Sequence, residues 1–232
     1  MKVGTDGVLL GAWAYVDQCK HILDMGTGTG LVALMAAQRS KAHIVAVDLD
    51  ADAVGQASEN FAASPWHDRL LALEADVRVI GNEEDGDAVS GNSLSPMFDV
   101  SSFDAILCNP PYFENSLKSP DAARTMARHT DTLSFDELAR SASRLLTPDG
   151  ELSVVIPYDR TMDMTISAAC YGLFATRQTL VAPVEGGKPK RILMAFSRQG
   201  APHSPEILSI RNKLNDYTPG YVSLVKDFYL KM

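Results

Sequence analysis

The chain has 232 residues, of which 46% are hydrophobic and 22% charged, a composition typical of a globular domain and unlike that of disordered or fibrous proteins. Its formal net charge of −8 disfavours a protein that coats nucleic acid, because such binding depends on Lys and Arg neutralising phosphates, but a local basic patch remains compatible with it. The longest apolar runs fall far short of the roughly 20 residues that cross a bilayer, and the chain does not begin with a signal-peptide pattern. We therefore predict one cytoplasmic domain over residues 1–232, with no membrane attachment and no obligate protein partner.

The three cysteines are Cys19, Cys108 and Cys170. They are widely separated, and none has a second Cys or a His at the spacing of a metal site. We interpret them as buried, reduced thiols and expect no metal.

The first predicted element is a helix from Val8 to Tyr15, which follows the run Lys2-Val3-Gly4-Thr5-Asp6-Gly7. Thr5 and Asp6 form a small polar pair of the kind that caps helices. We interpret the pair either as an N-cap alone or as part of a functional site.

A glycine-rich turn then joins a predicted strand, residues 22–25, to a helical pattern that begins at Leu31. The turn reads Asp24-Met25-Gly26-Thr27-Gly28-Thr29-Gly30. Glycines are needed where the backbone turns sharply and a ligand approaches without a Cβ in its way. The dinucleotide fingerprint is not met, because position 31 is Leu where a third glycine is required. The pattern indicates a nucleotide-binding βαβ unit of another kind.

Two carboxylates end the next two predicted strands. Asp48 follows the strand at residues 43–47, about 20 residues beyond the glycines, where a carboxylate can accept hydrogen bonds from both hydroxyls of a ribose. Asp76 follows the strand at residues 70–75, at the edge of a parallel sheet where ligands bind. Asp76 is placed to hold the amino group of an adenine, and the alternative is a solvated loop residue.

Residues 81–102 are polar, small and acidic. Such a segment buries too little apolar surface to offset the entropy of ordering it. We predict a flexible insertion here, ahead of the fourth strand.

The fourth strand, residues 103–108, ends at Asn109-Pro110-Pro111-Tyr112. Two prolines cannot continue a strand ladder, because neither has an N–H to donate. The run sets an amide side chain, a rigid backbone with free carbonyls and an aromatic ring at the carboxyl end of the strand. This arrangement suits a flat, amino-bearing group, and the alternative is a simple turn.

The rest of the chain continues the alternation of helices and strands. Asp50 is predicted to cap a helix at residues 51–61, and Ser134 with Glu137 forms a capping-box pattern for a helix ending near Leu146. Further elements are expected as a strand at 151–156, a helix at 161–171 and strands at 173–181 and 191–197. The loop before the last strand carries three cations, Lys188, Lys190 and Arg191.

Taken together, the glycine turn, Asp48, Asp76 and Asn109-Pro110-Pro111-Tyr112 resemble the amino-directed class I S-adenosylmethionine-dependent methyltransferases. Further segments are similar to the bacterial tRNA1(Val) (adenine-37-N6)-methyltransferases. These are the run from Lys2 to Gly7, Ser64-Pro65-Trp66, Ala127-Arg128-His129-Thr130 and the strand at 191–197. Members of that family usually carry a further segment ahead of this run.

The resemblance implies a doubly wound, mostly parallel, seven-stranded Rossmann-like sheet with an antiparallel late strand. It also implies methylation of adenosine 37 in tRNA by S-adenosylmethionine, with S-adenosylhomocysteine as product. The implied catalytic residues are Asn109, Pro110, Pro111 and Tyr112. The implied cofactor residues are Thr5, Asp24, Gly26, Gly28, Gly30, Asp48 and Asp76. Candidates for tRNA contact, chosen by position, are Lys2, Arg128, Lys188, Lys190 and Arg191.

Other functions stay open on the residues alone. The same Asn-Pro-Pro-Tyr run would serve protein glutamine N5-methylation, because a carboxamide nitrogen is as planar and delocalised as that of adenine. Guanine N2 methylation is a smaller rival. A non-catalytic cofactor-binding or RNA-binding module is a third class.

Overall fold

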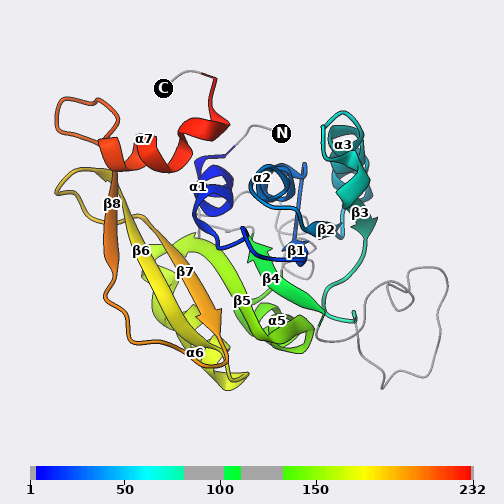
Figure 1. Ribbon diagram of the computed structural model, residues 1–232. Coiled ribbons are helices and arrows are strands. Elements are labelled where there is room, and N and C mark those ends of the chain that lie inside the picture. The colour runs from blue at the N-terminus through cyan, green and yellow to red at the C-terminus, as the bar shows by residue number, and fades with distance from the viewer. Residues whose placement is uncertain (1–3, 81–101, 111–132, 231–232) are drawn as a thin grey trace, which may run out of the picture.

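The predicted strands pair into one mixed sheet in the computed structural model, which describes residues 4–80, 102–110 and 133–230 (Figure 1). The described part contains eight strands in the order β3-β2-β1-β4-β5-β7-β6-β8. Their bounds are β1 His21–Met25, β2 His43–Asp48, β3 Leu70–Glu74, β4 Phe103–Cys108, β5 Leu146–Pro157, β6 Phe174–Val184, β7 Arg191–Ser197 and β8 Glu206–Arg211. All neighbouring pairs are parallel except those of β7, which runs antiparallel to both β5 and β6. The predicted fold class is confirmed.

The sheet has one strand more than the seven we expected. The additional strand, β8, pairs with β6 at the edge of the sheet. It was difficult to predict because an edge strand lacks the continuous apolar run of a buried one, and its residues are only half-buried or exposed.

Helices cover both faces of the sheet (Figure 1). One face carries α1 (Thr5–Trp13), α2 (Leu31–Arg39), α3 (Ala51–Ala62) and α7 (Pro219–Val225), and the other carries α5 (Phe135–Leu145) and α6 (Thr161–Cys170). Each face has its own hydrophobic core. The central strands β1 and β4 supply fully buried side chains to both cores, as expected for strands covered on two sides. Short 3-10 turns complete the described elements, at His67–Arg69, Tyr158–Arg160 and Lys226–Phe228.

Two of the three predicted helix caps are confirmed. The Asp50 side chain accepts from the backbone N–H of Asp52 at the start of α3, and Ser134 with Glu137 forms a complete capping box at α5. The cap predicted for α1 is wrong, because that helix begins at Thr5 and its N-cap position is Gly4, which makes no side-chain cap bond. Thr5 and Asp6 therefore lie inside the first turn of α1, and their side chains are available for other contacts.

The start of β5 also differs from the prediction. The strand begins at Leu146 rather than at residue 151, and the four residues 147–150 that resemble a turn are accommodated by an irregularity in the ladder. Phe103 pairs with Leu146 and Ala105 pairs with Glu151, so the register shifts between them. Gly150 permits this because a Cβ there would lie 2.8 Å from the carbonyl oxygen of Phe103.

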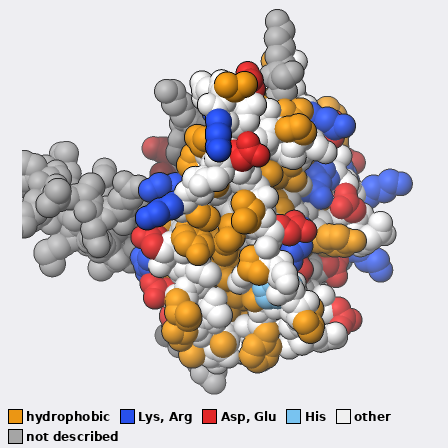
Figure 2. Space-filling view, turned by 90° about the vertical axis from the view of Figure 1, so that its left-hand side faces the viewer, with side chains coloured by type: hydrophobic (Ala, Val, Ile, Leu, Met, Phe, Trp, Pro, Cys, Tyr) orange, Lys and Arg blue, Asp and Glu red, His pale blue; other side chains and the backbone are white. Residues whose placement is uncertain are grey.

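The surface carries hydrophobic, basic and acidic side chains side by side. On the face that carries β8, hydrophobic side chains lie among charges of both signs (Figure 2), and Ile207 and Leu214 on this part of the chain are 72% and 83% exposed.

Among the cysteines, Cys108 is buried, Cys19 is half-buried and Cys170 is exposed, so the expectation of burial was wrong for Cys170. None of the described helices combines the length and apolarity needed to span a bilayer.

Candidate active site

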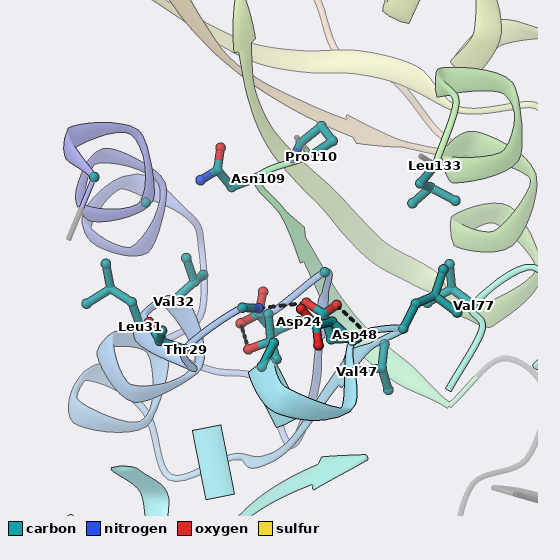
Figure 3. Close-up of a pocket in the computed structure, with 18 of the residues that line it drawn as sticks. Asp24, Thr29, Leu31, Val32, Val47, Asp48, Val77, Asn109, Pro110 and Leu133 are labelled. Carbon is teal, nitrogen blue, oxygen red and sulfur yellow. Dashed lines mark hydrogen bonds between the residues drawn. The ribbon is translucent and has the colours of Figure 1, made fainter. Parts of the chain in front are cut away.

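A cavity of about 780 Å³ opens at the carboxyl ends of β1, β2 and β4. This is the sheet edge where parallel α/β folds bind ligands. Its lining includes polar residues from the glycine turn, from both predicted carboxylate positions and from the end of β4 (Figure 3). Apolar side chains complete the wall, and sequence reasoning did not identify them. These are Leu31, Val32, Val47, Leu49, Val77 and Leu133.

The glycine turn has the backbone that its sequence predicts. Gly26, Gly28 and Gly30 all have positive φ, at +70°, +56° and +81°, a region that L side chains rarely adopt. Gly30 also has no room for a side chain, because a Cβ there would lie 2.5 Å from Cε1 of Phe61. At Gly26 a Cβ would meet nothing within 4 Å. Gly30 therefore serves packing of the turn against α3, whereas Gly26 leaves open space beside the cavity.

The Asp24 side chain stabilises the glycine turn through hydrogen bonds. Its carboxylate accepts the Thr27 hydroxyl at 2.6 Å and the Ala33 backbone N–H at 3.2 Å. The residue is 1% exposed, and this burial raises its pKa from 3.8 to about 6 against the opposing effect of those two hydrogen bonds. Asp24 borders the cavity, but its hydrogen bonds are with the turn and with the first turn of α2, so a direct contact to a cofactor stays a prediction.

Asp48 links the end of β2 to the same turn. Its Oδ2 accepts the Gly28 N–H at 2.8 Å, and its Oδ1 accepts the Asp50 N–H at 3.1 Å. Each carboxylate oxygen has two lone pairs, so each can accept one more hydrogen bond. The side chain is half-buried and faces the cavity (Figure 3), where it is oriented to receive a diol.

Asp76 also lines the cavity, but it is paired with a residue that sequence reasoning missed. Arg78 donates from Nε to both Asp76 oxygens, at 2.8 and 2.9 Å, and its Nη1 lies 3.5 Å from Glu137. Burial opposes ionisation of Asp76, but the hydrogen bonds and charge of Arg78 outweigh it and lower the pKa. Arg78 therefore fixes an ionised carboxylate in the cavity wall and ties it to the first turn of α5.

Asn109 and Pro110 follow the last residue of β4 and line the opposite side of the cavity (Figure 3). Asn109 is half-buried and its Nδ2 atom faces α1, since a Cβ placed on Gly7 would lie 3.8 Å from it. Pro110 is buried. Pro111 and Tyr112 lie outside the described residues, so their catalytic roles stay predictions.

The first turn of α1 lines the cavity beside Asn109. Thr5 and Asp6 both line the cavity, as does Arg191 from the start of β7. Arg191 was expected to contact RNA, but its Nε donates to Asp6 at 2.9 Å. Lys188 and Lys190 are exposed in the loop between β6 and β7. Lys2 and Arg128 fall outside the part of the chain that the structure describes.

Known proteins are similar to this chain in sequence and in fold. A family model described as methyltransferase small domain matches residues 8–171. A tRNA1(Val) (adenine(37)-N6)-methyltransferase from Phocaeicola vulgatus is 47% identical over 232 residues, which cover all of this chain and 92% of that protein. The chain belongs to this methyltransferase family.

Solved structures of other methyltransferases have the same fold. One described as a predicted O-methyltransferase from Agrobacterium tumefaciens has a TM-score of 0.67 at 19% identity, covering 96% of each chain. A geranyl diphosphate C-methyltransferase from Streptomyces coelicolor, in complex with Mg2+, geranyl diphosphate and S-adenosyl-L-homocysteine, has a TM-score of 0.53 at 13% identity, covering 82% of this chain and 75% of that one. At these identities the likeness concerns the fold alone.

The methyltransferase small domain match divides the cavity wall in two. The glycine turn, Asp48, Asp76 and Asn109 all fall within residues 8–171. The first turn of α1 and Arg191 fall outside this range, yet they line the same cavity. The relatives that match over the full chain include these outer parts.

Proposed function

We propose that this methyltransferase transfers a methyl group from S-adenosylmethionine to the N6 amine of adenosine 37 in tRNA1(Val). The observation that carries the proposal is the placement of Asn109 and Pro110 in one cavity with the glycine turn and Asp48. The full-length relative from Phocaeicola vulgatus supports the choice of substrate, because it bears the name of this activity.

The cavity fits a nucleoside cofactor by the chemistry of its lining. The spare lone pairs of Asp48 suit two ribose hydroxyls, and Gly26 leaves its backbone open to close approach. Apolar residues such as Val77 and Leu133 provide faces against which a flat base can pack. We propose that Asp76, held by Arg78, accepts the amino group of that base. S-adenosylmethionine would supply an electrophilic methyl group on a sulfonium.

The protein's task is then to prepare and align a weak nucleophile. The N6 lone pair of adenine is delocalised into the ring, and hydrogen bonds from the amine to the Asn109 Oδ1 and the Pro110 carbonyl would favour a more pyramidal nitrogen as positive charge develops. Holding that nitrogen in line with the methyl group makes the step effectively unimolecular, which contributes several kcal/mol. We propose that Pro111 stiffens this frame and that Tyr112 stacks on the base, a contact of about 1–3 kcal/mol. Nothing in this scheme requires a strong base.

We propose that Lys188 and Lys190 contact the tRNA backbone. Their loop lies at the same sheet edge as Asn109, because Pro157 at the carboxyl end of β5 pairs with Arg191 at the start of β7. Both side chains are exposed. Lys2 and Arg128 are further proposed contacts, and the cytoplasm, where tRNA is modified, is the proposed location.

The decisive experiment supplies S-adenosylmethionine with an unmodified tRNA1(Val) transcript and identifies the nucleosides by mass spectrometry. We expect N6-methyladenosine in this transcript and none in a matched transcript with guanosine at position 37. Peptide release factors, the substrate class for glutamine methylation, serve as the rival substrate. Methyl label in protein alone, or in a guanine, would overturn the proposal.

A further inference from the structure

An ion pair between two cavity-lining residues joins the first turn of α1 to the start of β7. Arg191 opens β7, and its Nε lies 2.9 Å from the Asp6 Oδ2 in the first turn of α1, 185 positions away in the sequence. Arg191 also donates from Nη1 to the Lys190 carbonyl at 3.2 Å. The side chains of Arg191 and Asp6 are 31% and 26% exposed. A charge-assisted hydrogen bond in such a half-buried place is stronger than an exposed surface pair.

This ion pair lies at the end of α1 that is next to Asn109. At the far end of the helix, Trp13 donates to the Thr179 hydroxyl at 2.9 Å and lies under the Arg177 guanidinium. At the near end, Gly4 provides no side-chain cap. The Arg191–Asp6 pair is therefore a polar contact that holds the first turn, in addition to the buried packing of Val8 and Leu9, while Trp13 anchors the last turn.

The first turn of α1 lies next to the Asn109 amide and limits how that amide can rotate. A Cβ on Gly7 would lie 3.8 Å from the Asn109 Nδ2 and 3.2 Å from a methyl group of Leu31. Gly7 therefore lies beside the amide nitrogen, with room for about one methyl group between them, and the Oδ1 atom points away from α1 (Figure 3). Movement of the turn would free the amide to rotate, and small misplacements of reacting groups cost large factors in rate.

We infer that Arg191 is a positioning residue for methyl transfer, which acts by holding Asp6 and the first turn of α1 against Asn109. This inference rests on the proposed function. It replaces the expectation that Arg191 serves tRNA binding, because a phosphate would have to compete with the Asp6 carboxylate for the same guanidinium.

The test compares Arg191→Ala, Arg191→Lys, Asp6→Asn and the Asp6→Asn/Arg191→Ala double variant in single-turnover reactions with saturating S-adenosylmethionine. We expect Arg191→Ala and Asp6→Asn each to lower the maximal rate by roughly tenfold or more, with the half-saturating tRNA concentration within about twofold of wild type. The double variant should be no slower than the slower single variant, because both changes break one interaction. Arg191→Lys, which keeps the charge, should recover part of the rate.

Arg160→Ala is the matched control. It removes another Arg–Asp pair, to Asp163, in which both side chains are more than half exposed, and neither residue lines the cavity. A maximal rate unchanged in Arg191→Ala, with a higher tRNA requirement and a weaker salt dependence, would show that Arg191 binds phosphate and would overturn the inference. Full activity of Asp6→Asn would do the same.

Hydrogen exchange separates this inference from the proposed function. Exchange of the amides at the start of α1 should accelerate in Arg191→Ala and Asp6→Asn but not in Arg160→Ala, whatever the substrate is. A wild-type protein that methylates no tRNA would refute the proposed function alone. Unchanged exchange in α1 of both cavity variants would refute the role of the ion pair alone.

Discussion

The two sides of the cavity are held by different kinds of contact. The side formed by the glycine turn is local, since Asp24 bonds to Thr27 three positions away and Asp48 bonds to Gly28 twenty positions away. The side formed by α1 and Asn109 is held by the Arg191–Asp6 pair across 185 positions. The glycine-turn side can keep its shape while distant elements move, because its hydrogen bonds are local. The side formed by α1 and Asn109 depends on the contact between β7 and α1. We therefore expect changes on the first side to affect cofactor binding and stability, and changes on the second to affect chemistry.

The largest effect is expected for Asn109→Ala. Loss of the amide oxygen removes a hydrogen bond that strengthens as charge develops on the nucleophile, which costs on the order of 100-fold or more in rate. Cofactor affinity should stay within a few-fold of wild type, because Asp48 and the glycine turn are untouched. Single-turnover kinetics and calorimetry measure the two quantities, and unchanged turnover would refute the catalytic role.

Next in size is the effect of Gly30→Ala on stability. The variant combines a φ of +81° with a Cβ 2.5 Å from Phe61, so we expect the free energy of unfolding to fall by about 3 kcal/mol, from backbone strain and overpacking. Gly26→Ala is the paired variant, with similar backbone strain but open space around its Cβ. It should lose only about 1 kcal/mol and should weaken S-adenosylmethionine binding. Urea unfolding of both variants tests this, and equal losses would contradict the packing argument.

The raised pKa of Asp24, in the glycine turn, predicts that the stability of the protein depends on pH. Its folded pKa of about 6 exceeds the ordinary value of 3.8, so the stability it contributes is present below pH 3.8 and is lost as pH rises through about 6. The loss amounts to roughly 3 kcal/mol. Asp24→Asn cannot ionise, so its stability relative to wild type should rise over this interval. Urea unfolding at several pH values between 4 and 7 measures the difference, and parallel profiles for the two proteins would show that Asp24 does not titrate in this range.

The division between local and distant contacts also explains most of what the sequence could predict, although Arg78 was missed only two positions from its partner Asp76. The glycine turn and both side-chain caps at Asp50 and Ser134 were predicted because their backbone conformations depend mainly on residues within a few positions. The start of β5 and the strand β8 were missed, since only neighbouring strands determine where a ladder begins. The partner of Arg191 could not be predicted, because nothing in the sequence near residue 191 indicates that Asp6 lies beside it.

A smaller effect is expected for Asp48→Ala, which removes the proposed ribose acceptor. Hydrogen bonds to a charged group are worth about 1.5–3 kcal/mol, so cofactor affinity should fall by about 10- to 100-fold. Asp104→Ala is the matched control, because the Asp104 Oδ2 also accepts two backbone N–H groups, of Lys20 and His21 at 2.7 and 3.0 Å. That carboxylate lies at the opposite edge of the sheet, so its loss should lower stability alone. Calorimetry showing equal cofactor affinity in Asp48→Ala and wild type would remove Asp48 from the site.

The smallest effect is expected for the Lys188→Ala/Lys190→Ala double variant. Both side chains are exposed, so each phosphate contact is screened by salt and contributes on the order of 1 kcal/mol or less. We expect a several-fold higher half-saturating tRNA concentration and a shallower dependence of tRNA affinity on salt, because fewer counterions are released. The maximal rate distinguishes this variant from Arg191→Ala. If both fell in maximal rate alone, the loop between β6 and β7 would support the α1 side of the cavity throughout, and the division between binding by the lysines and positioning by Arg191 would be wrong.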